Sequence, residues 1–267
     1  MSDRLLTSTE AAAWLSASPT SVKRWADAGL IDCVRTVGNH RRFTLDALER
    51  FAQTQGGEAS TTGVGEWMTL LLERNVDAVQ GQLLMERSVA QSWAEACDRL
   101  APVLTQIGEA WATGAIRVVD EHLATERLAR ALARIVDAQR VAPSGPTAML
   151  MTVAGDEHTL GLAFAEVVFR EAGWRTLWSG RSTPIDELAD ILRERGVDVL
   201  AVSASVYSSD EAHLDEQLAL LERACADAGC RLVIGGSGAW PDRATDARRT
   251  TSLRQLSRVI SEITEEL

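Results

Sequence analysis

The middle of the chain contains the pattern that most restricts its fold: an apolar run, a polar loop and a helical pattern follow one another directly. The apolar run spans residues 148–154, the loop spans residues 155–161, and the helical pattern ends at Gly173. A strand, a polar loop and a helix in this order open a βαβ unit. His158 is therefore predicted to lie at the carboxyl end of a strand, where open α/β sheets bind ligands.

The same alternation continues over residues 147–267. It predicts strands at 148–154, 174–179, 198–203 and 231–235, and helices at 160–172, 184–195, 211–228 and 252–265. Strands that alternate with helices form a doubly wound, mostly parallel sheet. This region is therefore predicted to be a Rossmann-like α/β domain.

Two neighbours of His158 give it the chemistry of a metal ligand. Asp156 can accept a hydrogen bond from one ring nitrogen, which leaves the other nitrogen free for a metal. Gly161 would let a bulky ligand approach the start of the following helix. A loop histidine is more often a surface or hydrogen-bonding residue than a metal ligand. These three residues therefore indicate a metal site only if other parts of the chain carry matching motifs.

Two later strands provide such motifs. One buried strand ends at Ser203, and another ends at Gly235 and Gly236. Taken alone, the glycine pair also fits a phosphate loop or a plain turn. Asp-x-His-x-x-Gly, a serine and a Gly-Gly pair in this order resemble the base-off, histidine-on cobalamin-binding domains. The resemblance implies that His158 is the lower axial ligand of cobalt. It also implies that Ser203 helps to hold the dimethylbenzimidazole and that the glycine pair makes room for the nucleotide tail.

The N-terminal residues 7–53 have the pattern of a small helix-turn-helix domain. Thr7 or Ser8 can cap a first helix, and Pro19 can begin a second helix that ends before Gly29. Val22 and Trp25 are spaced to face the core of the domain. The outer face of the second helix then carries four polar residues: Thr20, Ser21, Lys23 and Arg24.

A predicted hairpin follows at residues 31–43, with a turn at 37–39 and a basic return strand that contains His40, Arg41 and Arg42. Thr44 can cap a third helix over residues 45–53. The whole resembles the winged helix-turn-helix of MerR-type regulators. A lone basic triplet is usually a solvated turn, but beside a helix-turn-helix it is expected to contact DNA phosphates. Lys23 and Arg24 are expected to reach bases or phosphates in the major groove.

Residues 54–65 are rich in Gly, Ser and Thr and are predicted to be a linker. Apolar residues at helical spacing then predict helices at 66–78, 80–90, 92–112 and 117–140, which make a four-helix bundle. A short linker at 142–146 precedes the α/β domain. The expected domains are thus a DNA-binding domain at 1–55, a bundle at 66–141 and a cobalamin-binding domain at 147–267.

One group of residues in the bundle indicates a role beyond packing of the core. Trp111 is followed by nine residues and then by Glu121 and His122, with a break in the helix between them. Singly, the tryptophan reads as core and the glutamate as a solvated or paired acid. Together they match the Trp-x9-Glu-His signature of the CarH/LitR family of cobalamin-dependent photoreceptor regulators. The resemblance implies that the bundle caps the upper face of adenosylcobalamin, that Trp111 covers the adenosyl group, and that Glu121 and His122 contact it or shape its pocket.

Charge and composition limit the partners of the protein. The net charge is −11, but residues 1–55 hold seven Lys/Arg and six Asp/Glu, a net of +1, while the remainder holds 20 against 32, a net of −12. Any DNA contact is therefore expected in the N-terminal domain. No apolar stretch has membrane-spanning length, no signal peptide opens the chain, and the four cysteines are scattered. A cytoplasmic protein with reduced thiols and no membrane partner is expected.

The resemblance to the CarH/LitR family covers nearly the whole chain. It implies a repressor rather than an enzyme, which binds operator DNA as an adenosylcobalamin-loaded tetramer and releases it when light breaks the cobalt–carbon bond. One residue departs from the family pattern: Ala112 follows the signature tryptophan, where well-known photoreceptor members carry a histidine. A histidine-ligated photoproduct would then have to use His122 or His213, or water would take the position.

Three alternatives stay open on the sequence. The protein could sense cobalamin without responding to light, a reading that Ala112 motivates. It could be a corrinoid methyl carrier, although such carriers have no reason to contain a winged helix-turn-helix. It could also be a regulator that has lost the cofactor and responds to protein partners.

Overall fold

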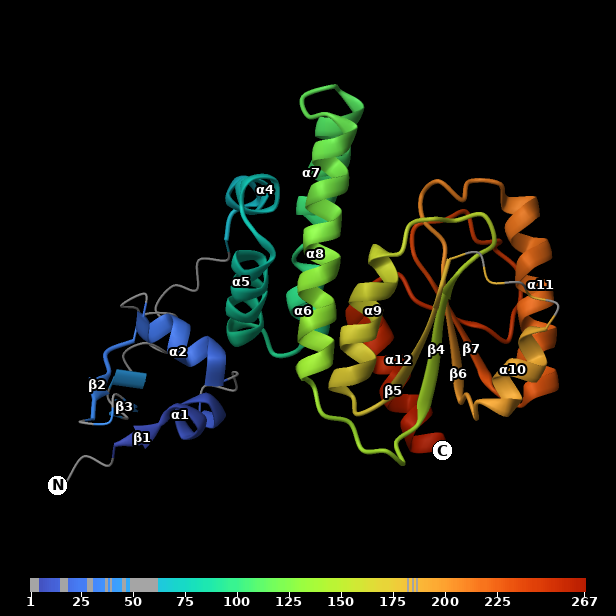
Figure 1. Cartoon of the computed structure of the whole chain (residues 1–267). Coiled ribbons are helices and arrows are strands. Elements are labelled where there is room, and N and C mark those ends of the chain that lie inside the picture. The colour runs from blue at the N-terminus through green and yellow to red at the C-terminus, as the bar shows by residue number, and fades with distance from the viewer. Residues whose placement is uncertain are drawn as a thin grey trace.

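The computed structural model describes residues 5–14, 19–27, 31–36, 38, 40–44, 47–48, 62–181, 183, 185 and 187–267; within these ranges the side chains of residues 13, 14, 20, 21, 24 and 27 are not described. Three parts follow one another along the chain (Figure 1). They are a small N-terminal part, a helical part and an α/β domain. This order agrees with the fold class predicted from the sequence.

The N-terminal part contains β1 (Leu6–Thr7), α1 (Ser8–Trp14), α2 (Pro19–Asp27), β2 (Val34–Arg35) and β3 (Arg41–Phe43). Its strands form an antiparallel sheet of order β1-β3-β2, so the predicted wing hairpin is present. Val22 and Trp25 lie in the core of this part, as predicted. Thr7 is the residue that caps α1, because its hydroxyl accepts the Glu10 N–H and the Glu10 carboxylate accepts the Thr7 N–H.

Several predicted features of this part lie outside the described residues. They are the N-cap Ser18, the end of the second helix at residues 28–30, the turn residues 37 and 39, the linker residues 54–61, and the third helix except for residues 47–48, which are helical.

The bundle consists of five helices, not four: α4 (Val64–Glu73), α5 (Val76–Val89), α6 (Trp93–Asp98), α7 (Ala101–Ala112) and α8 (Val118–Ala138). The predicted break between the first two helices, at residue 79, was wrong by several residues, because α4 ends at Glu73 and Asn75 caps α5 by accepting the Ala78 N–H. The predicted helix 92–112 is two helices. Pro102 lies in the first turn of α7, where its missing N–H is tolerated, and the chain turns at residues 99–100. Helix α4 also begins at Val64, two residues before its predicted start at residue 66.

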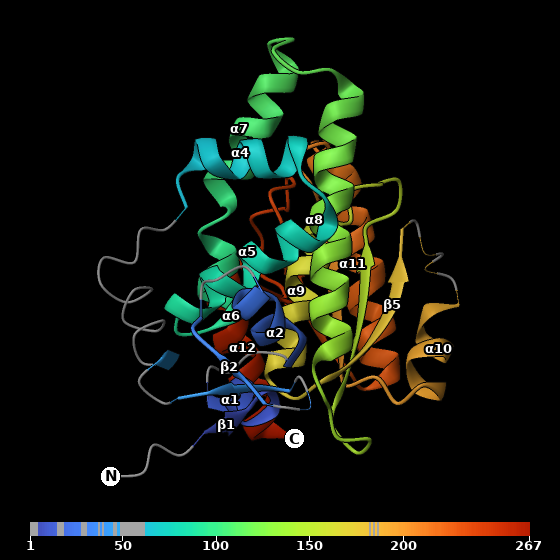
Figure 2. The ribbon, with the colours of Figure 1, turned by 60° about the vertical axis from the view of Figure 1, so that its left-hand side comes forward.

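Over its described residues, the α/β domain contains five strands and four helices. They are β4 (Thr147–Thr152), α9 (Leu160–Glu171), β5 (Arg175–Gly180), α10 (Leu188–Glu194), β6 (Val199–Ser203), α11 (Glu211–Ala228), β7 (Arg231–Gly235), β8 (Arg248–Arg249) and α12 (Leu253–Glu266). The sheet is parallel, with order β5-β4-β6-β7-β8. Helices α9 and α12 cover one face, and α10 and α11 cover the other (Figures 1 and 2). The strand order reverses between β4 and β6, which places the expected ligand crevice there.

The bundle packs on the α9 and α12 face of the sheet. Phe164 and Val167 of α9 belong to the same apolar core as the bundle helices. Glu171, at the end of α9, accepts hydrogen bonds from the Arg87 side chain and from the Trp93 N–H. The junction of α7 and α8 lies at the same end of the molecule as the loop that follows β4 (Figure 1). The bundle and the carboxyl ends of the strands thus flank one region of the molecule.

Candidate functional site

His158 lies in the loop after β4, as predicted, and its partner is Asp156. The ring Nδ1 is 3.0 Å from Asp156 Oδ1, and the His158 backbone N–H donates to the same oxygen at 2.9 Å. Since an ionised carboxylate only accepts hydrogen bonds, Nδ1 carries the proton, and in the neutral imidazole Nε2 has the lone pair. The imidazole side chain is 53% exposed. His158 therefore offers an accessible Nε2, and the hydrogen bond between Nδ1 and Asp156 helps to set the direction of this nitrogen.

The Asp156 carboxylate is buried and fully supplied with donors. Its Oδ2 accepts the Ser205 N–H at 2.6 Å and the Ser208 hydroxyl at 2.7 Å. Burial by itself raises the pKa of Asp156, but the hydrogen bonds from Ser205, His158 and Ser208 outweigh it and lower the pKa to about 2. The carboxylate is thus ionised at neutral pH and stabilises the Nδ1–H form of the imidazole.

Buried polar groups fix the loop that carries this pair. The Thr152 hydroxyl donates to the Asp156 carbonyl at 2.6 Å, and the Asp156 N–H donates to the Val153 carbonyl at 3.1 Å. Gly155 has φ +82°, a conformation that glycine adopts without strain, and it permits this tight turn. Gln217 of α11 is buried, and its side-chain oxygen accepts the Ala154 N–H at 2.6 Å. The backbone of the loop is therefore held from both sides.

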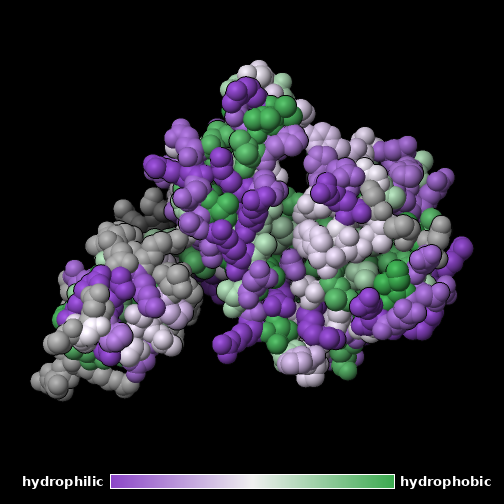
Figure 3. Space-filling view, in the orientation of Figure 1, coloured by the Kyte–Doolittle hydropathy of each residue, from purple (hydrophilic) through white to green (hydrophobic). Residues whose placement is uncertain are grey.

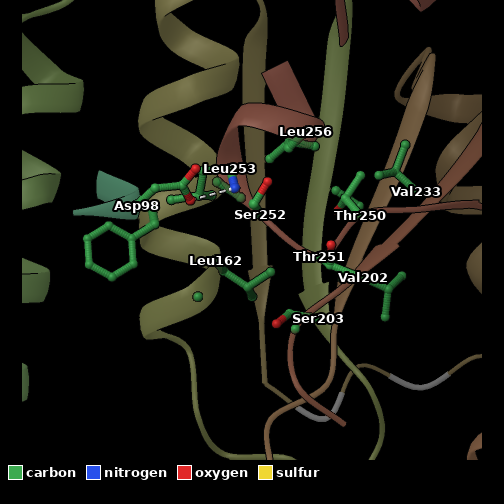
Figure 4. A pocket seen from close by; sticks show the side chains of 16 residues that line it. Asp98, Leu162, Val202, Ser203, Val233, Thr250, Thr251, Ser252, Leu253 and Leu256 are labelled. Carbon is green, nitrogen blue, oxygen red and sulfur yellow. Dashed lines mark hydrogen bonds between the residues drawn. The ribbon is translucent and has the colours of Figure 1, made fainter. Parts of the chain in front are cut away.

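A cavity of about 220 Å³ lies between α9, the ends of β6 and β7, and the start of α12 (Figure 4). Four of the residues predicted to bind cobalamin line it together: Gly161, Ser203, Gly235 and Gly236. A Cβ on Gly161 would lie 3.2 Å from Ser203 Oγ, and a Cβ on Gly235 would lie 3.0 Å from Thr250 Oγ1. The missing side chains at these two glycines keep the cavity open, which fits a planar or elongated group beside the sheet.

Gly236 also has a structural reason to be glycine. Its φ is +87°, and a Cβ there would lie 2.1 Å from the Ala204 carbonyl oxygen. The backbone of the β7 loop is therefore packed directly against the segment that follows β6. This contact supports Ser205 and Ser208, which supply the donors to Asp156.

The structure places Trp111 at the end of α7, and Glu121 and His122 in the first turns of α8. His122 Nδ1 lies 2.7 Å from the Val118 carbonyl and 3.1 Å from Glu121 Oε2, so this imidazole also presents Nε2. The Thr125 hydroxyl donates to Glu121 Oε1. The described residues that line the cavity do not include Trp111, Glu121, His122 or His158.

Large apolar side chains are exposed around this junction of α7 and α8. They are Trp111, Val118, Val119 and Leu123. The space-filling view shows apolar surface at the same end of the bundle (Figure 3). An apolar tip beside the carboxyl ends of the strands suits a ligand that lies between them.

The predicted DNA-contacting residues all belong to the N-terminal part. Lys23 on α2 and His40 before β3 are exposed, and Arg41 and Arg42 on β3 are partly buried. The remaining three predicted residues, Thr20, Ser21 and Arg24, lie on α2, but their side chains are outside the described set.

The described residues contain no group of three or more His, Cys, Asp or Glu side chains able to hold a metal ion. A single accessible imidazole with a carboxylate behind it suits a metal whose other ligands come with a cofactor. The donor set at His158 thus fits the cobalt of a corrin better than a free ion.

Sequence reasoning missed several residues of this site. Ser205 and Ser208 lie two and five residues after the end of β6, so their position at the ligand edge was open to prediction. Asp98 lines the cavity from the bundle, and Gln217 reaches the loop from the middle of α11. No sequence signal connects these two residues to a site far away in the chain.

Comparison with known proteins agrees with this organisation. A helix-turn-helix domain family matches residues 5–56, and two B12 binding domain families match residues 70–135 and 146–250. The HTH-type transcriptional repressor CarA of Myxococcus xanthus is 33% identical over 147 residues, 54% of this chain and 47% of the relative. The repressor CarH of the same organism is 29% identical over 142 residues, 52% of this chain and 46% of the relative. The chain thus aligns with about half the length of these relatives.

The monomethylamine corrinoid protein of Methanosarcina barkeri has a similar solved structure, with a TM-score of 0.55 and 13% identity. The match covers 74% of this chain and 96% of that one. At this identity the likeness shows the fold alone. In the described part of the chain, no helix is long and apolar enough to cross a membrane.

Proposed function

We propose that this chain is a cobalamin-binding regulator of the CarA and CarH type, which represses transcription under the control of adenosylcobalamin and light. The observation that carries the proposal is the His158–Asp156 pair, which presents Nε2 at the ligand edge of the sheet. The cavity lined by Gly161, Ser203 and the glycine pair lies at the same edge.

The residues present fit cobalamin. His158 would supply the lower axial nitrogen, and Asp156 would hold the imidazole and increase its basicity. Ser203, Gly161, Gly235 and Gly236 would enclose the nucleotide tail. Bound adenosylcobalamin supplies a cobalt–carbon bond that light can break.

Trp111, Glu121 and His122 are the proposed contacts to the upper face. Their position on the junction of α7 and α8, at the same end of the molecule as the His158 loop, supports this role. The adenosyl group against Trp111 would distinguish the dark state from the lit state, which a population shift requires. Because Ala112 occupies the position after Trp111, His122, His213 or water would have to take the vacated position in the lit state.

Operator binding would depend on assembly. A single small DNA-binding domain on an acidic chain should bind DNA weakly, whereas several linked copies raise the effective concentration of each at adjacent sites. We propose a homo-tetramer in the dark, which loses operator affinity when it dissociates. The protein would then act as a regulator and not as an enzyme.

The first test is size-exclusion chromatography of the protein with adenosylcobalamin, with absorbance detection, in the dark and after illumination. A cobalamin-containing large species in the dark that becomes smaller in light is the expected result. If cobalamin does not co-elute with the protein, the cofactor assignment is wrong.

Ala112 favours a second candidate, a regulator that senses cobalamin without light. In that case cobalamin would co-elute, but illumination would change neither the size of the complex nor its operator affinity. The same chromatography, combined with an operator gel shift in light and dark, separates the two candidates.

Substitution of His158 tests the axial assignment. His158→Ala should abolish cobalamin retention or weaken it strongly, because the corrin would lose its only proposed protein nitrogen on the lower face. His40→Ala, in the N-terminal part, is the matched control and should retain cobalamin like the wild type. Equal retention by both variants would contradict the assignment.

A further inference from the structure

Tyr207 lies flat against the imidazole of His158. The two ring centroids are 4.5 Å apart, and the ring planes differ by 18°. Tyr207 is the single tyrosine of the chain, and it is 59% exposed. Since core burial does not hold the phenol ring in this place, the stack itself and the local backbone must do so.

The backbone around Tyr207 is fixed by the same groups that supply Asp156. The Tyr207 N–H donates to Ser205 Oγ at 3.3 Å, and the Ser208 N–H donates to the Ser205 carbonyl at 2.9 Å. The Ala239 N–H donates to the Ser208 carbonyl at 2.9 Å, which ties this loop to the segment after β7. The segment 205–208 therefore binds the carboxylate through two donors and presents an aromatic ring beside the imidazole.

The hydrogen bond to Asp156 does not fix the imidazole completely. An imidazole rotates about two side-chain bonds. Asp156 Oδ1 at 3.0 Å and Ser205 Oγ at 3.3 Å both contact the single atom Nδ1, so they fix the position of one ring atom while the ring plane can still tilt about it. A second ring packed against the imidazole face removes this tilt. The Nε2 lone pair then has one direction.

We propose that Tyr207 is a positioning residue for the lower axial ligand, which orients His158 Nε2 toward cobalt by stacking on the imidazole. This role rests on the proposed cobalamin site. It requires the aromatic face and not the hydroxyl group, so phenylalanine should replace tyrosine. Aromatic stacks of this kind are worth about a twofold to tenfold change in an equilibrium constant.

The test compares the full chain with Tyr207→Ala and Tyr207→Phe in two measurements. In cobalamin-free protein, NMR of the carbon-bound ring protons of His158 reports the ring current of the stacked aromatic. In protein loaded with methylcobalamin at constant pH, the visible spectrum reports the fraction of cobalt ligated by histidine. Because Tyr207 is largely exposed, both variants are expected to fold, and the amide NMR spectrum checks this.

Tyr207→Ala should lose the ring-current shift, and its equilibrium constant for histidine ligation should fall about twofold to tenfold. Tyr207→Phe should keep both properties. The inference is overturned if Tyr207→Ala retains wild-type ligation, or if Tyr207→Phe loses as much as Tyr207→Ala. If the wild type itself retains no cobalamin, the proposed function fails first, and that outcome differs from a failure confined to the variants.

Discussion

At the scale of single residues, Asp156 is the group on which the site depends most. Its carboxylate is buried, and it accepts hydrogen bonds from His158 in its own loop and from Ser205 and Ser208 in the loop after β6. Its pKa is lowered to about 2. A depressed folded-state pKa stabilises the folded protein above the unfolded pKa of about 3.9, and this stabilisation is lost as pH falls through the folded value. The contribution at neutral pH is roughly 2 kcal/mol.

Asp156→Asn should therefore lower the free energy of unfolding by roughly 2 kcal/mol at pH 7, because an amide cannot accept all of these hydrogen bonds. The difference from the wild type should shrink between about pH 4 and pH 2, where the wild-type carboxylate becomes protonated. Urea unfolding at several pH values measures it. Asp190→Asn, in an exposed ion pair with Arg193, is the control and should change stability little. A pH-independent difference for Asp156→Asn would contradict this account.

Two glycines allow backbone strain to be separated from a steric clash. Gly155 and Gly236 both have positive φ, but a Cβ on Gly155 meets no atom within 4 Å, while one on Gly236 meets Ala204 at 2.1 Å. Gly155→Ala should cost about 1–2 kcal/mol from strain alone. Gly236→Ala should cost at least about 1 kcal/mol more and should displace the Ser205 loop. Thermal unfolding measures both costs, and equal losses would show that Ala204 yields easily.

The residues of the site were partly open to prediction. The pairing of Asp156 with His158, and the position of Gly161, Ser203 and the glycine pair around one cavity, could be predicted because spacing within a loop and strand ends are local signals; their binding of cobalamin stays a prediction. Asp98 and Gln217 were not found, because their contacts join segments 155 and 63 residues apart. Pairing over such distances follows from tertiary packing, which no local pattern encodes.

At the scale of elements, helix α12 shows how the bundle and the sheet domain are joined. Its first N–H groups, at Leu253 and Arg254, donate to the Asp98 carboxylate at the end of α6, at 2.8 and 3.1 Å. The next N–H, at Gln255, donates to the hydroxyl of Ser252, the helix's own N-cap. An acid from one domain thus caps a helix of the other, in a position that the helix dipole favours.

Asp98→Ala should lower the stability by about 1 kcal/mol and should speed amide hydrogen exchange at both the end of α6 and the start of α12. Ser252→Ala is the matched control, because it removes a cap of similar strength within one domain. It should speed exchange only in the first turn of α12. If Asp98→Ala leaves α6 as protected as in the wild type, this cap does not couple the two domains.

Element boundaries were less predictable than element types. The strands and helices of the α/β domain lie within a few residues of their predicted ranges, because buried strands and amphipathic helices have distinct periods. The bundle was predicted with one helix too few. Pro102 is compatible with the first turn of a helix, so it did not indicate the break at residues 99–100 that precedes α7. Strand β8 was missed, since two residues carry no periodicity.

At the scale of the whole molecule, charge is divided between a nearly neutral N-terminal end and an acidic body. Residues 1–55 carry a net charge of +1 and the rest carries −12, so DNA should be bound by the N-terminal part and repelled elsewhere. Each phosphate neutralised by a cation releases counterions, which makes the affinity fall with salt. The slope of log K against log salt therefore measures the number of phosphates that the protein contacts.

Lys23 on α2 is an exposed cation through which this can be tested. If it contacts a phosphate, Lys23→Gln should weaken operator binding and reduce the slope of log K against log salt by about 0.9 for each copy engaged. Arg193→Gln, on α10 of the acidic body, removes the same charge and should leave the slope unchanged. Fluorescence anisotropy of labelled operator DNA over a salt series measures both. Equal changes in the two variants would mean that net charge, and not a contact of α2, sets the affinity.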